Sequence, residues 1–135
     1  MRHTATLAGT LVLGAILLTP TVELKAQATP DSLPPGVTSK MISQGKTLFH
    51  GAGLCTVCHG QDAKGMPNMG ANLTDTTWLH NDGSYEGILN TIKSGVTSEQ
   101  STTGTVMPPK GGSSLSDDQV KAVAAYVWSL SRTKH

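Results

Sequence analysis

The chain has 135 residues, a formal net charge of +1 and 37% apolar residues. That length suits one small domain, and the near balance of charges argues against a nucleic-acid-binding surface. Aromatic residues make up only 4% of the chain. A small domain with so few large side chains needs apolar bulk from another source to complete its core.

The first residues have the layout of a secretory signal peptide. Arg2 precedes an apolar run over residues 5–18, and Ala26-Gln27-Ala28 offers a small-x-small cleavage site. The apolar run is shorter than the ~20 residues that a membrane-spanning helix needs. We therefore expect residues 1–28 to be a signal peptide and the protein to be periplasmic. An uncleaved membrane anchor is the alternative.

A proline-rich segment comes next. Residues 29–36 contain three prolines and are expected to form a flexible lead-in to a domain over residues 37–135. The domain opens with a helical apolar pattern, because Ile42, Gly45 and Phe49 fall on one helix face. Glycines shortly after this pattern predict the end of the helix.

Two cysteines three residues apart, with a histidine directly after, are typical of the attachment site of a c-type haem. From one helical turn, Cys55 and Cys58 can form thioethers with the haem vinyl groups, and His59 can ligate the iron. The alternatives are a redox dithiol, half of a zinc site and a structural disulfide. A thioredoxin-like dithiol is expected in a βαβ unit, which the sequence does not indicate. No second cysteine pair or spaced histidine pair follows to complete a zinc site.

We therefore predict one covalently bound haem c. The porphyrin would also supply the missing apolar bulk, so the haem-free protein is expected to be largely unfolded.

The middle of the chain alternates between loop and helix. Residues 60–73 are rich in Gly, Asn and Met and predict an irregular loop. A backbone carbonyl of this loop is expected to accept the Nδ1–H of His59, although the sequence does not identify it. Ser84 is a good N-cap for a helix that ends near Gly95. The apolar face of that helix consists of Tyr85, Ile88, Leu89 and Ile92.

Residues 95–114 have no hydrophobic periodicity, and we expect a long loop that carries an axial ligand around the haem edge. A final helix follows, with Ser116 as its N-cap and Gln119 at the capping-box position. Its buried stripe is expected to consist of Val120, Val123, Ala124 and Val127.

The second axial ligand is predicted to be Met107. It follows His59 by enough chain to reach the far face of the haem, and the prolines after it stiffen the segment. His80 is the competitor and would give bis-histidine ligation. The remaining methionines after residue 28 and one further histidine are less suitable: Met41 and His50 belong to the first helix, and Met66 and Met69 follow His59 too closely.

Residues 39–130 resemble a class I monohaem cytochrome c, similar to short bacterial cytochromes and to the haem c domains of oxidase subunits. The resemblance is carried by Gly45-Lys46-Thr47-Leu48-Phe49, Cys55 with Cys58-His59-Gly60, Gly70-Ala71-Asn72-Leu73-Thr74-Asp75, Met107-Pro108, Leu115-Ser116-Asp117 and Ala124-Ala125-Tyr126-Val127. It implies an all-α fold of three to four helices around one haem, with the first and last helices crossing.

At that crossing the resemblance implies that Gly45 and Phe49 meet Val123 and Tyr126, and it makes Met107 the distal ligand. Ala71 departs from the family, because many relatives have a proline there whose carbonyl receives the proton of the proximal histidine. The Ser/Thr-rich residues 97–105 are a second departure.

The function that follows is a one-electron carrier, not an enzyme, between a donor dehydrogenase or membrane complex and an acceptor such as a terminal oxidase. The alternative is a dedicated electron-transfer subunit of one dehydrogenase. A peroxidase or gas-binding protein is disfavoured, because one haem motif is present and it does not lie near the C-terminus. The expected partners are redox proteins, with no nucleic acid and only transient membrane contact, and the chain is expected to be monomeric.

Overall fold

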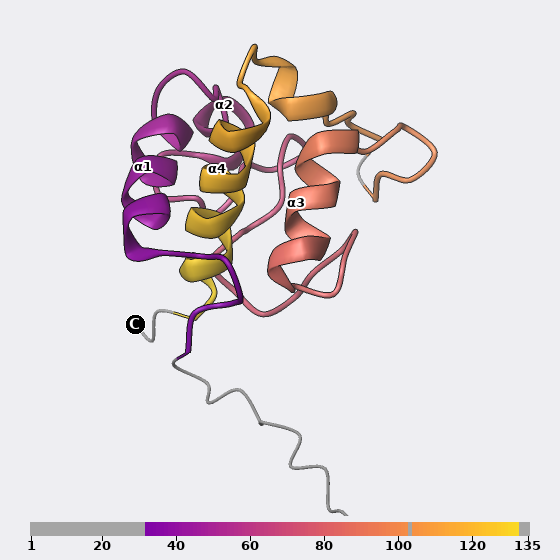
Figure 1. The fold of residues 1–135 in the computed structure, drawn as a ribbon. Coiled ribbons are helices and arrows are strands. Elements are labelled where there is room, and N and C mark those ends of the chain that lie inside the picture. Colours follow the sequence, from indigo (N-terminus) through magenta and orange to yellow (C-terminus); the bar gives the residue numbers. More distant parts are fainter. Residues whose placement is uncertain (1–31, 103, 133–135) are drawn as a thin grey trace, which may run out of the picture. The chain divides into compact units, whose positions relative to one another are not determined.

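The computed structural model describes residues 32–102 and 104–132, and the expected signal peptide lies outside them. The described part is helical: α1 is Ser39–Phe49, α2 is Thr56–His59, α3 is Tyr85–Ser94 and α4 is Asp117–Leu130, with a short 3-10 turn η1 at Pro109–Gly112 before α4 (Figure 1). In these residues β-pairing is limited to two isolated bridges. The predicted all-α fold is confirmed.

Helix α1 packs directly against α4. The Thr38 side chain caps α1 by accepting a hydrogen bond from the backbone N–H of Met41, so the helix begins at Ser39. A Cβ built on Gly45 would collide with the backbone carbonyl of Ala122 in α4. The glycine is therefore required by the close approach of the two helices. Next to it, the rings of Phe49 and Tyr126 meet edge to face at 5.4 Å between centroids.

The ends of the other two long helices follow their predicted caps. The Ser84 hydroxyl accepts from the N–H of Gly87, and α3 stops at Gly95, which has a φ of +72°. In α4, Ser116 and Gln119 form both hydrogen bonds of a capping box. Both predicted helices are confirmed.

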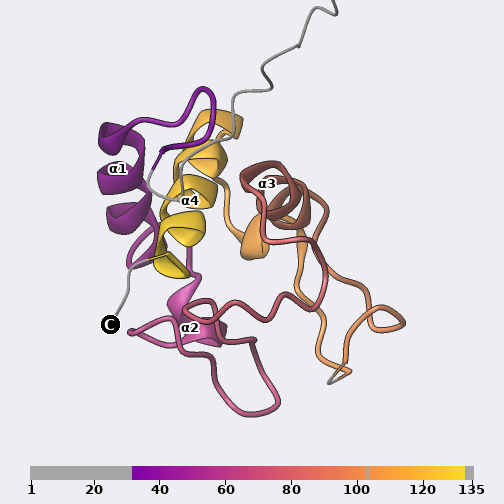
Figure 2. The same ribbon diagram turned by 90° about the horizontal axis from the view of Figure 1, so that it is seen from below.

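Helix α4 is the central element of the fold. Figures 1 and 2 show it between α1 on one side and α3 on the other, and it contacts both. It is buried almost all round from Ala122 to Trp128. Phe49, Val120 and Val123 are the largest fully buried side chains. The hydrophobic core is therefore centred on α4, with α1 and α3 packed against it.

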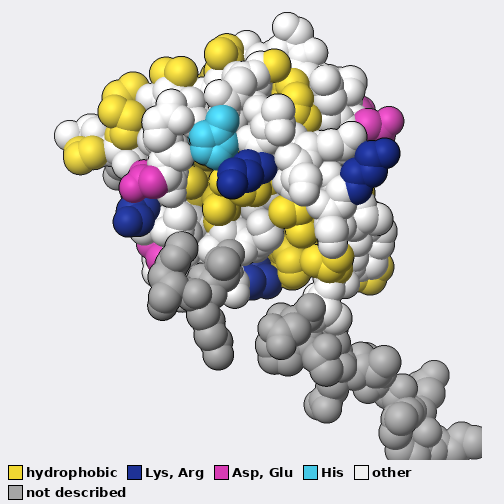
Figure 3. Space-filling model, turned by 90° about the vertical axis from the view of Figure 1, so that its left-hand side faces the viewer, with side chains coloured by type: hydrophobic (Ala, Val, Ile, Leu, Met, Phe, Trp, Pro, Cys, Tyr) yellow, Lys and Arg dark blue, Asp and Glu magenta, His cyan; other side chains and the backbone are white. Residues whose placement is uncertain are grey.

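The lead-in contains a turn where it is described, because the N–H of Val37 donates to the carbonyl of Pro34. On the face shown in Figure 3, charged side chains of both signs are scattered rather than clustered. Among residues 32–102 and 104–132, none of the helices is both long and apolar enough to cross a membrane.

The α1–α4 contact makes the first testable prediction. Gly45→Val should lower the free energy of unfolding by about 2–3 kcal/mol, because the new side chain overlaps the main chain of α4. Ser43→Ala, at an exposed position of the same helix, should change it by less than about 0.5 kcal/mol. Chemical denaturation measures both. A more stable Gly45→Val protein would contradict the close approach.

Candidate haem site

The cysteines and the histidine of the motif lie on one turn. Cys55 immediately precedes α2, Cys58 lies within it, and His59 is its last residue. The N–H of His59 donates to the carbonyl of Cys55 at 2.9 Å, which closes the turn. Gly60, with a φ of +77°, then takes the chain out of the helix. The structure thus brings together the three residues that the motif singles out.

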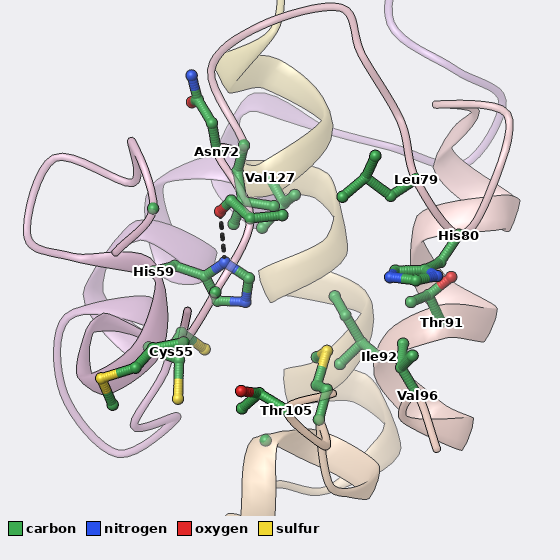
Figure 4. A pocket seen from close by; sticks show the side chains of 18 of the residues that line it. Cys55, His59, Asn72, Leu79, His80, Thr91, Ile92, Val96, Thr105 and Val127 are labelled. Atoms are coloured by element: carbon green, nitrogen blue, oxygen red, sulfur yellow. Dashed lines mark hydrogen bonds between the residues drawn. The ribbon is translucent and has the colours of Figure 1, made fainter. Parts of the chain in front are cut away.

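The ring of His59 is oriented by the main chain. Its Nδ1 lies 2.9 Å from the carbonyl oxygen of Ala71, and since a carbonyl can only accept, Nδ1 carries the proton. The lone pair is therefore on Nε2, the nitrogen suited to a metal. Figure 4 shows the ring reaching into a cavity. Burial lowers the pKa of His59 and the bond to Ala71 opposes this, so the net effect favours the neutral ring, the form that can bind a metal. The carbonyl that the sequence leaves open is that of Ala71.

The thiol of Cys55 is poorly suited to redox exchange. Burial raises the pKa of Cys55 to about 11, with a further contribution from the neighbouring Cys58. At neutral pH the thiol of Cys55 is protonated, and it lies 3.3 Å from the carbonyl oxygen of Gly53. No disulfide joins the two cysteines. In the described part of the chain no three His, Cys, Asp or Glu residues gather as a metal site. A thiolate-based dithiol and a zinc centre are both disfavoured.

A cavity of about 470 Å³ lies beside the motif, within the range of small-molecule and cofactor sites. Its walls come from α2, α3, α4 and the two long loops, and it reaches into the apolar core. The aliphatic side chains lining it include Ile88, Ile92, Leu115, Val123 and Val127. A mainly apolar cavity with two thiols and an imidazole at its wall suits a porphyrin.

Met107 is held at this cavity by its backbone. Its N–H donates to the carbonyl of Val96 at 3.0 Å and its carbonyl accepts from the N–H of Val96 at 2.8 Å, an isolated bridge at the end of α3. The side chain lines the cavity and packs against the core. The expected loop over residues 95–114 is therefore held by this bridge between Val96 and Met107, and it contains the short turn η1.

The competing ligands also lie within reach of the cavity. Figure 4 shows the ring of His80 across the cavity from His59, on the loop before α3. Met66 and Met69 line the cavity too, with 40% and 42% of their surfaces exposed. Met41 packs against the core and is not part of the lining.

His50 lies at the end of α1, outside the cavity lining. Its two ring nitrogens lie 2.8 Å from the carbonyl oxygen of Lys46 and 3.0 Å from that of Gln61. This places it as a link between α1 and the loop after the motif, consistent with a helix-end histidine.

Comparison with known proteins identifies the family. The family model for cytochrome c matches residues 42–131, two thirds of the chain. The chain belongs to the cytochrome c family. With its two cysteines three residues apart and a histidine after them, this cytochrome carries one covalently bound haem c. Cytochrome c domains are typically electron carriers rather than enzymes.

Individual relatives agree with this membership. The chain is 41% identical over 90 residues to the CcoP subunit of a cbb3-type cytochrome c oxidase from Rubrivivax gelatinosus, covering 66% of this chain and 26% of the relative. It is 47% identical over 83 residues to CcoP of Rhodobacter capsulatus, covering 56% and 25%. The chain thus spans about a quarter of the length of these curated relatives.

Among solved structures, cytochrome cL from Methylophaga aminisulfidivorans MPT is similar, with a TM-score of 0.51 and 26% identity. The similarity covers 67% of this chain and 53% of that one. The fold of this chain is thus similar to that of a cytochrome of known structure, in agreement with the sequence comparisons.

Replacement of both cysteines should abolish covalent haem attachment. The Cys55→Ala/Cys58→Ala protein should show no haem stain after denaturing electrophoresis, because no thiol remains to form a thioether. Thr56→Ala, between the two, should keep the full stain. A stained band in the double variant would refute attachment at these residues.

Removal of the haem should unfold most of the domain, because the cavity interrupts the core between α3 and α4. The far-ultraviolet circular dichroism of haem-free protein should lose most of its helical signal and show no cooperative melt. The holoprotein is the control. A haem-free protein with the helical content of the holoprotein and a sharp transition would contradict this expectation.

Proposed function

We propose that this cytochrome is a one-electron carrier with His59 and Met107 as axial ligands and with haem attached through Cys55 and Cys58. It would pass electrons from a donor dehydrogenase or membrane complex to an acceptor such as a terminal oxidase. The observation that carries the proposal is the backbone bridge between Met107 and Val96, which keeps the methionine at the cavity that the ring of His59 enters.

Haem iron supplies a one-electron couple between its ferrous and ferric states. The residues of this chain supply what that couple requires. The carbonyl of Ala71 keeps Nε2 of His59 as the ligating nitrogen. The thioether of Met107 would be a soft ligand that favours the ferrous state and would raise the potential relative to a second histidine. With the iron held by both His59 and Met107, oxygen and peroxide would have no open site.

A second candidate is an electron-transfer subunit held in a stable complex. Two observations favour it: the relatives from Rubrivivax gelatinosus and Rhodobacter capsulatus are named as oxidase subunits, and apolar side chains outside the cavity lining are exposed in the motif and next to Met107. Val57 and Val106 are 58% and 51% exposed. Exposed apolar groups of this kind are typical of an interaction surface. Co-purification of a redox protein with the native cytochrome would favour this candidate.

We infer a periplasmic location for the carrier. The inference rests on the signal-peptide layout of residues 1–28, with residues 29–36 as a lead-in to the domain at 37–135. An exported domain of this kind would meet its redox partners at the outer surface of the inner membrane.

The axial ligand is tested by optical spectroscopy of the holoprotein. Met107→Ala should abolish the weak long-wavelength charge-transfer band that a methionine sulfur gives to ferric haem, and the reduced variant should bind carbon monoxide rapidly. His80→Ala and Met66→Ala should keep the band. If His80→Ala rather than Met107→Ala opens the sixth position, the ligand set is bis-histidine. If the unmodified protein binds carbon monoxide rapidly, the carrier proposal is wrong.

A further inference from the structure

Two loops that are distant in sequence are joined by a side chain at the cavity. The hydroxyl of Thr105 donates a hydrogen bond to the backbone carbonyl of Asn68 at 2.6 Å, across a separation of 37 residues. Both residues line the cavity, and Figure 4 shows Thr105 there. One loop carries Ala71, which orients His59, and the other leads directly into Met107.

The acceptor is presented by a closed turn. Asn68 has a left-handed backbone conformation, with a φ of +60°, which asparagine tolerates better than most residues. The turn is closed by Met66 and Gly70, whose backbones form an isolated bridge with bonds of 3.0 Å and 3.1 Å. The carbonyl of Asn68 therefore lies on a small unit with little freedom to shift.

The donor lies beside the predicted ligand. Thr105 is two positions before Met107 and half-buried, and the bridge to Val96 fixes the segment at Met107 itself. The segment of Met107 is thus attached at one point to Val96, just after the end of α3, and at another to the loop that carries Asn68 and Ala71. The first attachment uses backbone groups, whereas the second depends on a side chain that a substitution can remove.

We propose that the hydrogen bond from Thr105 to Asn68 is a clasp that keeps the Met107 segment closed over the haem, which makes Thr105 a positioning residue for the axial ligand. The proposal rests on the proposed function, because it takes Met107 as the ligand. When the clasp opens, the segment can swing from the loop of His59 and the sulfur leaves the iron more often. One hydrogen bond contributes about 1 kcal/mol, so its loss should raise the open population about fivefold.

The test measures how fast imidazole binds to the ferric holoprotein, since imidazole reaches the iron only after the sulfur has left. Thr105→Val removes the hydroxyl at nearly constant volume and should speed imidazole binding about fivefold. Thr105→Ser keeps a donor and should bind imidazole at a rate close to that of the unmodified protein. Thr97→Val makes the same change at an exposed position of the same loop, outside the cavity lining, and is the matched control.

The acceptor is tested from the other side of the bond. Asn68→Val disfavours the left-handed backbone conformation and should displace the carbonyl. Asn68→Gly allows the same conformation and should leave the carbonyl in place. The valine variant should speed imidazole binding in the same way as Thr105→Val. The double variant should be no faster than either single one, because both changes break the same bond.

Three results would overturn the clasp. Imidazole binding could be unchanged in Thr105→Val, the Thr97→Val control could speed it equally, or the effects of Thr105→Val and Asn68→Val could add fully. These outcomes differ from failure of the proposed function, in which Met107→Ala itself keeps the charge-transfer band. Loss of the band in Met107→Ala together with an unchanged rate in Thr105→Val leaves the carrier intact and removes the clasp alone.

Discussion

The close approach of α1 and α4 is the contact on which the rest of the structure depends. It requires that residue 45 have no side chain, because the carbonyl of Ala122 occupies that space. One side of α4 is thereby committed to α1, while Val123 and Val127 of the same helix line the cavity. The motif turn follows α1 after a short connection, so the position of α1 on α4 also determines where Cys55 meets the cavity wall. A change in the helix contact would shift the attachment point and the wall relative to each other.

The loops around the cavity obtain their shape from backbone geometry rather than from a hydrophobic pattern. Among the described residues, four other than glycine have positive φ angles in these loops or close by: Leu54, Ala63, Asn68 and Lys110. Such conformations are costly for L-residues and persist where surrounding bonds hold them. The carbonyls of Ala71 and Asn68, which accept from His59 and Thr105, belong to this network. The polar part of the site is therefore built largely from main-chain groups.

The helices and the haem motif could be predicted from the sequence, whereas the contacts that shape the loops could not. The spacing of apolar residues and the caps at Ser84 and Ser116 were sufficient for the three long helices, because those signals are local. The motif identified the cofactor, because its chemistry requires particular side chains at a particular spacing. The bridge between Val96 and Met107 could not be foreseen, since backbone hydrogen bonds between distant segments leave no trace in residue type. The choice of Ala71 as acceptor was open for the same reason, and the Thr105 hydroxyl was one of many in a Ser/Thr-rich stretch.

The bond from His59 to a main-chain oxygen has a consequence for how this protein can vary. A proximal histidine held by a carboxylate side chain would feel every substitution at the partner position through the partner's charge. Here the acceptor is present whatever residue occupies position 71, so point substitutions there leave the dipole facing Nδ1 in place as long as the chain keeps its path. The electron density that the histidine donates should therefore change little when the residue at position 71 is substituted, but should change when residues are inserted into or deleted from the loop. Tuning the potential through this hydrogen bond would thus require a change in the path or length of the loop rather than a change of the residue at position 71.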